Sequence, residues 1–166
     1  MSTQSTTAPQ LFLLDSQKDF QEFAIQLAKQ TRRYIYILSR DLDASVYGTH
    51  EFVETISTLA RDNRYTEIKI LVKNTRELAE TSHPLVKLTQ RLPNKITLQK
   101  LKIKPNNTNI KFIIYNTQQL LYKADEEGYL GFANFNAATE IKRLRETFDY
   151  VWGYGEPEEY LQTLSI

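Results

Sequence analysis

The feature of this sequence that most constrains its fold is the alternation, over the first two-thirds of the chain, of short apolar runs with amphipathic segments of helical period. The apolar runs favour strands and cover residues 11–14, 33–38, 68–72 and 96–103. Segments with apolar residues on one helical side lie between them. Strands that alternate with helices build βαβ units, so the sequence predicts an α/β fold around a largely parallel sheet.

The last third of the chain changes to short strands joined by tight turns. These runs cover residues 110–115, 120–122 and 129–132, and a final amphipathic helix follows. Neither an internal repeat nor a linker divides the chain, whose 166 residues suit one domain. We therefore expect residues 11–166 to form a single α/β domain after a disordered tail at residues 1–10, which is rich in Ser, Thr and Gln.

Composition excludes several classes of protein. No apolar run approaches the ~20 residues that span a bilayer, and the N-terminus lacks a signal-peptide pattern, so we expect a cytoplasmic domain without membrane contact. The absence of cysteine excludes disulfides and thiolate metal sites. His50 and His83 are too far apart in sequence for a helical metal-binding pair, and we expect no cofactor. A net charge of +1 argues against a broad polyanion-binding surface but leaves room for a local phosphate site.

One stretch of the last third has the spacing of a known signature. Asn109, Lys111 and Asn116 bracket a strand-like run, and Gly131 and Asn134 follow on a strand that leads to the last helix. This pattern resembles the phospholipase D superfamily, whose signature is His-x-Lys-x4-Asp followed by Gly-Ser/Gly-x-Asn. The resemblance implies a phospholipase D-like αβα sandwich, in which a mixed, mostly parallel sheet is flanked by helices.

The sequence departs from this signature at the residues that carry the chemistry. Asn109 occupies the position of the nucleophilic histidine, Asn116 that of the aspartate, and Phe132 that of the small residue after the glycine. Family enzymes form a phospho-histidine, and an asparagine amide supplies neither a nucleophile nor a group that titrates near neutral pH. Loss of a covalent nucleophile costs on the order of 10⁴- to 10⁶-fold in rate. We therefore expect a catalytically inactive phospholipase D-like domain, not an enzyme.

The positions retained from the signature predict an anion-binding site. A lysine ammonium and asparagine amides hold phosphate or carboxylate oxygens, so we expect Lys111, Asn109 and Asn134 to converge on an anionic small molecule or nucleic acid. Arg40 follows a central strand, at the edge where open α/β sheets bind ligands, and belongs to the same expected site. His83 precedes a proline at a helix start and is a further candidate for ligand binding.

Each of these residues also has a plain structural interpretation. Lys111 alternates with apolar residues, which suits a solvent-facing lysine on a half-buried strand. Asn116 is an ordinary turn residue, and Asn134 with Asn136 would cap the last helix. His83 would then only satisfy backbone groups at its helix start.

A second basic cluster lies on the strand before this motif. Lys100, Lys102 and Lys104 share one face of the strand because they are spaced two residues apart. Such a row could contact nucleic-acid phosphates, but lysines more commonly protect the edge of a sheet. We therefore expect an edge strand here.

The resemblance also bears on partners. Family members of this length pair two chains so that their motifs face each other, which implies a symmetric homodimer. The stretch 82–93 further resembles an uncharacterised bacterial family that is sometimes appended to acetyltransferase-like domains. The competing function is an interaction module, accessory to an acetyltransferase-like partner. A metal-independent phosphodiesterase or nuclease that uses His83 or His50 is the last alternative.

Overall fold

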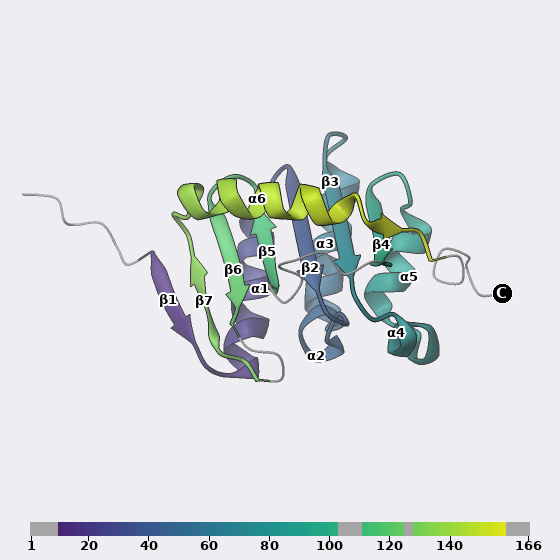
Figure 1. Cartoon of the computed structure of the whole chain (residues 1–166), viewed down its shortest axis with the longest axis horizontal. Coiled ribbons are helices and arrows are strands. Elements are labelled where there is room, and N and C mark those ends of the chain that lie inside the picture. The colour runs from purple at the N-terminus through teal and green to yellow at the C-terminus, as the bar shows by residue number, and fades with distance from the viewer. Residues whose placement is uncertain (1–9, 103–110, 125–127, 159–166) are drawn as a thin grey trace, which may run out of the picture.

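The structure is a computed structural model of the chain that describes residues 10–102, 111–124 and 128–158. An eight-stranded sheet in the order β1-β7-β6-β5-β2-β3-β4-β8 forms its middle layer (Figure 1). The strands are β1 (Leu11–Leu14), β2 (Tyr34–Ser39), β3 (Glu67–Val72), β4 (Ile96–Leu101), β5 (Lys111–Tyr115), β6 (Gln119–Lys123), β7 (Gly131–Asn134) and β8 (Gly155–Glu156). The helices are α1 (Gln17–Gln30), α2 (Ala44–Tyr47), α3 (His50–Asp62), α4 (Arg76–Thr81), α5 (Pro84–Arg91) and α6 (Ala138–Trp152).

Helices cover both faces of the sheet, which confirms the expected αβα sandwich. The helix α6 crosses one face, and α1, α3 and α5 pack on the other (Figure 1). Each layer has its own hydrophobic core, and β2 lies between the two cores. Residues Ile35 to Ser39 of β2 are all buried. A strand buried on both faces reads as a continuous apolar run, which is why this segment shows no polar alternation.

The direction of the strands corrects one expectation. Among the described strands, β2, β3 and β4 run parallel, and the other five pairings are antiparallel. The sheet is mixed as expected, but the expectation that it is mostly parallel is wrong. The connections between β5, β6 and β7 are too short to hold a crossover helix, and short connections join antiparallel neighbours.

Local sequence signals set the helix boundaries. Ser16 Oγ accepts a hydrogen bond (3.1 Å) from a main-chain N–H in the first turn of α1, and Thr49 Oγ1 does the same for α3 (3.2 Å). α4 and α5 are separate helices because Ser82 between them has a left-handed φ of 54°, after which Pro84 starts α5. No helix in the described ranges is long and apolar enough to cross a bilayer.

A cluster of rings and charges ties α6 to the sheet. Phe148 stacks on Tyr36 with ring centroids 5.0 Å apart, and Trp152 stacks on Phe148 at 5.6 Å. The Arg145 guanidinium lies 4.4 Å from the centroid of the Tyr36 ring and donates through Nη2 to the Tyr36 hydroxyl (3.0 Å). Tyr36 in turn donates to Glu67 Oε1 (2.5 Å). The cluster therefore joins α6, β2 and β3.

At Gly131 the main chain of β7 passes so close to β6 that no side chain fits. A Cβ on Gly131 would lie 2.0 Å from the Tyr122 carbonyl oxygen and 2.7 Å from Phe20 Cζ. We expect Gly131→Ala to lower the free energy of unfolding by about 1–3 kcal/mol, the usual cost of overpacking, in urea unfolding followed by circular dichroism. Gly153→Ala is the matched control, since its Cβ would meet nothing closer than 3.4 Å. Equal losses in the two variants would contradict this account.

Candidate functional site

A small cavity lies at the carboxyl edge of the parallel strands. It forms where β2 ends at Ser39 and Arg40, where β5 begins at Lys111, and where β6 ends at Lys123. Its volume is about 30 Å³, room for roughly one or two water molecules. Open α/β sheets bind their ligands at this edge, so the cavity is the candidate functional site.

Two lysines lie side by side in the wall of the cavity. Lys111 and Lys123 are partners in the antiparallel ladder of β5 and β6, and both line the cavity. Lys111 is only 6% exposed, whereas Lys123 is half-buried. Like charges that face each other across a ladder destabilise it, and a buried ammonium requires anionic or hydrogen-bonding partners. The acidic groups that line the same cavity therefore stabilise this part of the sheet by offsetting the charge of the two lysines.

Those acidic groups come from the loop after β2, where Asp41 and Asp43 line the cavity. Asp43 accepts hydrogen bonds from the Ser45 main-chain N–H (3.0 Å), from Ser45 Oγ (2.8 Å) and from the Tyr129 hydroxyl. Burial by itself would raise the pKa of the Asp43 carboxyl, but these hydrogen bonds and the attraction of Lys123 lower that pKa below its usual value. The cavity thus contains a stable carboxylate opposite its lysines.

Tyr129 connects the acidic and basic sides of the cavity. Its hydroxyl, which binds Asp43, also lies 3.0 Å from Ser45 Oγ and accepts a hydrogen bond from Gln17 Nε2 (3.2 Å). Lys123 Nζ lies 5.1 Å from the centroid of the Tyr129 ring, within the range of a cation–π interaction. One aromatic side chain therefore contacts both charges.

The structure places the predicted residues near β5 as follows. Arg40 is exposed and lines the cavity together with Lys111. Asn109 lies outside the described residues. Asn116 has a left-handed φ of 57°, and its Oδ1 accepts hydrogen bonds from the main-chain N–H groups of Arg33 (3.1 Å) and Tyr34 (3.3 Å). Asn116 is therefore a turn residue that ties the β5–β6 turn to the start of β2.

The structure does not bring Asn134 to Lys111. The ladders of β5, β6 and β7 align Asn134 with Ile114, which is three residues, or roughly 10 Å, along β5 from Lys111. Asn134 also lies two strands away from β5. Asn134 Oδ1 accepts from the Asn136 main-chain N–H (2.9 Å), and its Nδ2 donates to Glu140 Oε2 (3.4 Å). The expected convergence is wrong because β7 runs antiparallel to β6, which carries Asn134 to the opposite edge of the sheet.

His83 lies beside the acidic loop, but its ring is fully engaged. Nδ1 accepts a hydrogen bond from the Leu85 main-chain N–H (3.1 Å), which caps α5, so the proton on Nε2 donates to the Leu42 carbonyl (2.8 Å). The residue is 3% exposed and does not line the cavity. Burial lowers the pKa of the imidazole below its usual value, although the Leu42 carbonyl and the carboxylates of Asp43 and Asp41 act against this. His83 therefore joins two backbone segments.

The sequence does not predict Lys123 and Tyr129 as site residues, and for Asp43, which follows a central strand, it slightly favours a polar-loop interpretation over a site role. Asp43 belongs to a polar loop at the correct edge of the sheet, but loop composition alone does not separate a site residue from a solvated one. Lys123 and Tyr129 enter the cavity through the pairing of β6 with β5 and through tertiary packing. One signal was present in the sequence: a hairpin centred on residues 116–118 places Lys123 opposite Lys111.

Comparison with known proteins identifies the family and the fold. Residues 16–164 match the family described as Domain of unknown function (DUF7931). No curated protein matches the sequence.

Solved structures with the same fold include two phospholipase D-like proteins and a chromatin protein. NucT from Helicobacter pylori has a TM-score of 0.67 at 15% identity, and the match covers 89% of this chain and 97% of NucT. Nuc from Salmonella typhimurium, a phospholipase D family member, has a TM-score of 0.65 at 10% identity, with 88% and 97% covered. The archaeal chromatin protein TrmBL2 has a TM-score of 0.62 at 11% identity, with 92% of this chain but 55% of TrmBL2 covered. The fold is therefore phospholipase D-like, and this chain spans about half the length of TrmBL2.

The buried imidazole predicts a loss of stability on mild acidification. Because the pKa of His83 is lower in the folded chain than in the unfolded chain, the unfolded state binds more protons as the pH falls. The contribution of His83 is thus complete above the unfolded pKa of about 6.5 and decreases below it. We expect the free energy of unfolding to fall between pH 7.5 and pH 5, a window above the range in which ordinary carboxyl groups titrate.

The test compares two variants by urea unfolding across this pH range. His83→Asn retains a side chain that caps helices well but removes the titration, and should flatten the profile at a lower overall stability. His50→Gln removes the exposed histidine at the start of α3 and should leave the wild-type profile intact. A profile that responds to His50→Gln and not to His83→Asn would contradict the assignment.

Proposed function

The chain belongs to DUF7931, a family of domains of unknown function, and from this premise we propose that its phospholipase D-like domain binds a phosphate-containing ligand without hydrolysing it. This proposal rests on the cavity at the carboxyl edge of the sheet. The cavity is lined by Lys111, Lys123 and Arg40, and its described lining residues include no histidine. Ammonium and guanidinium groups hold phosphate oxygens by charge-assisted hydrogen bonds. Without an imidazole, the same groups bind the ligand and leave its ester bonds intact.

The proposal of inactivity is supported by the state of both histidines. The covalent mechanism of phospholipase D-like enzymes uses an imidazole nitrogen with a free lone pair, and both nitrogens of His83 are used in backbone hydrogen bonds. His50 is exposed at the start of α3 and is absent from the cavity lining. In the sequence, Asn109 occupies the position of the nucleophilic histidine of the phospholipase D signature. A loss of 10⁴- to 10⁶-fold in rate, on the order of 5–8 kcal/mol in barrier, makes turnover negligible.

The size of the cavity limits where a phosphate group binds. A cavity of about 30 Å³ is already shared by Asp43 and Tyr129, so a phosphate group contacts its mouth instead of its interior. Arg40 is the exposed cation at that mouth. Lys111 lies deeper and adds attraction that the surrounding low dielectric strengthens. Arg40 is therefore the residue that touches the ligand, and Lys111 raises the local positive potential.

Nucleic acid is one source of such a phosphate group. TrmBL2 shows a novel mode of DNA binding, and this supports a phosphodiester ligand for a domain of the same fold. A net charge of +1 favours a ligand that contacts few phosphates, because each neutralised phosphate requires a lysine or arginine. A short single-stranded oligonucleotide meets both conditions.

We expect the purified protein to bind a labelled single-stranded oligonucleotide in EDTA and to leave a chromogenic phosphodiester unhydrolysed. Arg40→Gln should weaken binding about tenfold, since a hydrogen bond to a charged group contributes about 1.5 kcal/mol or more. Lys111→Met should also weaken binding, because it removes the buried positive charge behind the ligand. Fluorescence anisotropy measures the binding. Lys142→Met removes an exposed cation on α6 and should change the affinity little.

Two results would overturn the proposal. Turnover of the diester that Lys111→Met abolishes would make the protein an enzyme with an unrecognised nucleophile. Equal binding by wild type, Arg40→Gln and Lys111→Met would show that the oligonucleotide does not bind at this cavity.

The second candidate function, partner binding, is supported by the apolar surface of β1. This strand lies at the edge of the sheet (Figure 1), yet Leu11 is 53% and Leu13 83% exposed. Leu130, which precedes β7, is 56% exposed. Exposed apolar edge strands pair with other chains, and we infer that a second copy of this chain pairs there about a two-fold axis. An acetyltransferase-like partner is the other occupant expected from the sequence.

Sedimentation velocity at tens of micromolar tests this alternative. We expect a dimer that Leu13→Lys dissociates, because a lysine on an edge strand opposes strand pairing. Tyr65→Lys changes an equally exposed apolar residue far along the sheet, beside β3, and should leave the dimer intact. A dimer that survives Leu13→Lys would instead support the arrangement in which the two motifs face each other, and a monomer would contradict both.

A further inference from the structure

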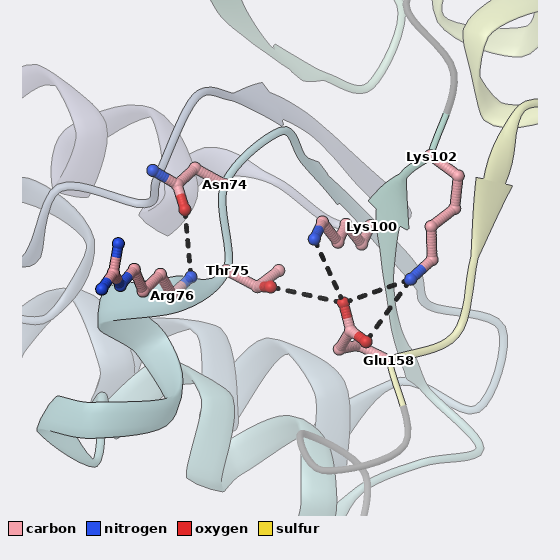
Figure 2. A network of polar contacts seen from close by, with 6 residues as sticks. All are labelled: Asn74, Thr75, Arg76, Lys100, Lys102 and Glu158. Carbon is pink, nitrogen blue, oxygen red and sulfur yellow. Dashed lines mark hydrogen bonds and ion pairs between the residues drawn. The ribbon is translucent and has the colours of Figure 1, made fainter.

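A second group of cations lies at the same edge of the sheet, at the end of β4. The short strand β8 pairs with Lys100 and Leu101, and the residues that follow bring the Glu158 carboxylate against β4. Figure 2 shows that carboxylate between Lys102 on one side and Lys100 and Thr75, which follows β3, on the other. A carboxylate supplied by the chain itself therefore fills a site made by β3 and β4.

Glu158 has several contacts with other described residues, and these contacts are long. Lys102 Nζ lies 3.5 Å from both carboxylate oxygens, and Lys100 Nζ lies 3.7 Å from Oε2. The Thr75 hydroxyl donates to Oε2 over 3.3 Å. Charge-assisted hydrogen bonds are ordinarily about 2.7–2.9 Å long, so one carboxylate does not reach all three donors at their best distances. The donors are spaced for a larger anion.

The charges in this group also do not balance. Two lysines surround one carboxylate, and the Glu158 side chain is 12% exposed while those of Lys100 and Lys102 are 31% and 35% exposed. Glu156, the ladder partner of Lys100, is exposed and forms no ion pair with either lysine among the described residues. A phosphate group carries about −1.5 to −2 charges at pH 7 and has three acceptor oxygens. It matches two ammonium groups and a hydroxyl better than a carboxylate does.

From this geometry we propose that Lys100, Lys102 and Thr75 form a second anion-binding site, which takes a dianionic phosphate group in exchange for the Glu158 carboxylate. The site goes beyond the proposed function and does not rest on it. Strands β2 and β3 separate β4 from β5, so at about 4.8 Å per strand the site lies roughly 14 Å from the Lys111 cavity. Lys100 and Lys102 remain partly exposed, so an incoming phosphate reaches them without disturbing the core.

The test measures the affinity of the full chain for inorganic phosphate by calorimetry at pH 7.5, with sodium chloride holding the ionic strength constant. Glu158→Ala removes the competing carboxylate and should raise the affinity about tenfold or more. Glu158→Gln, which retains the shape of the side chain, should also raise the affinity for phosphate. Lys100→Met/Lys102→Met added to Glu158→Ala should abolish the gain. Glu156→Ala removes the neighbouring exposed carboxylate and is the matched control, with little change expected.

Further measurements identify the ligand and distinguish this site from the cavity at β5. Phenyl phosphate, a small phosphomonoester, should bind like inorganic phosphate if the site accepts substituted phosphates, and only inorganic phosphate should bind if it does not. Lys111→Met should leave the gain in phosphate affinity of Glu158→Ala unchanged. The result would therefore stand even if the cavity at β5 binds no ligand. The proposal is overturned if Glu158→Ala and Glu158→Gln bind phosphate no better than wild type. It is equally overturned if the gain persists without both lysines.

Discussion

The antiparallel pairing of β2 with β5 joins the two halves of the sheet, and the geometry of the carboxyl edge depends on its register. On one side of this pair lie the parallel strands β3 and β4, and on the other the antiparallel strands β6, β7 and β1. The register aligns Leu38 with Phe112, so the start of β5 meets the end of β2. Lys111 consequently lies beside Ser39 and Arg40. A slip of one residue would send Lys111 to the opposite face of the sheet.

Acidic side chains of the chain itself oppose the cations at this edge. Asp43 lies in the cavity with Lys111 and Lys123, and Glu158 lies between Lys100 and Lys102. Both carboxylates also accept hydrogen bonds from hydroxyl groups, Asp43 from Ser45 and Glu158 from Thr75. Without these acids, several partly buried ammonium groups would repel one another and destabilise the sheet. At both proposed sites an external anion would have to compete with an internal carboxylate, so we expect binding to favour groups of higher charge or better shape.

Most of the fold could be predicted from the sequence, because β2, β3 and the main helices carry strong apolar patterns and clear caps such as Ser16. The sheet direction could not, because strand pairing depends on the tertiary path of β5 to β7. Helix α2 and strand β8 span four and two residues, too few for a periodic pattern. Asn134 matched the signature in spacing along the chain, yet the turn before β7 reverses its direction and removes it from the cavity. Lys123 could be identified only once the hairpin register was known.

The attachment of β8 has a consequence for local stability. Two ladder pairs hold β8 to β4, and one more hydrogen bond joins the Lys102 N–H to the Tyr154 carbonyl. The Glu158 carboxylate adds only the long, partly exposed contacts with Lys100, Lys102 and Thr75, and the nearest preceding core contact is Trp152 of α6. Segments held by few contacts open at far lower free energy than the core to which they attach. We therefore expect residues 154–158 to open from β4 as a unit while α6 stays packed. When that unit opens, β4 becomes a free edge strand, and its backbone groups and both lysines become accessible together.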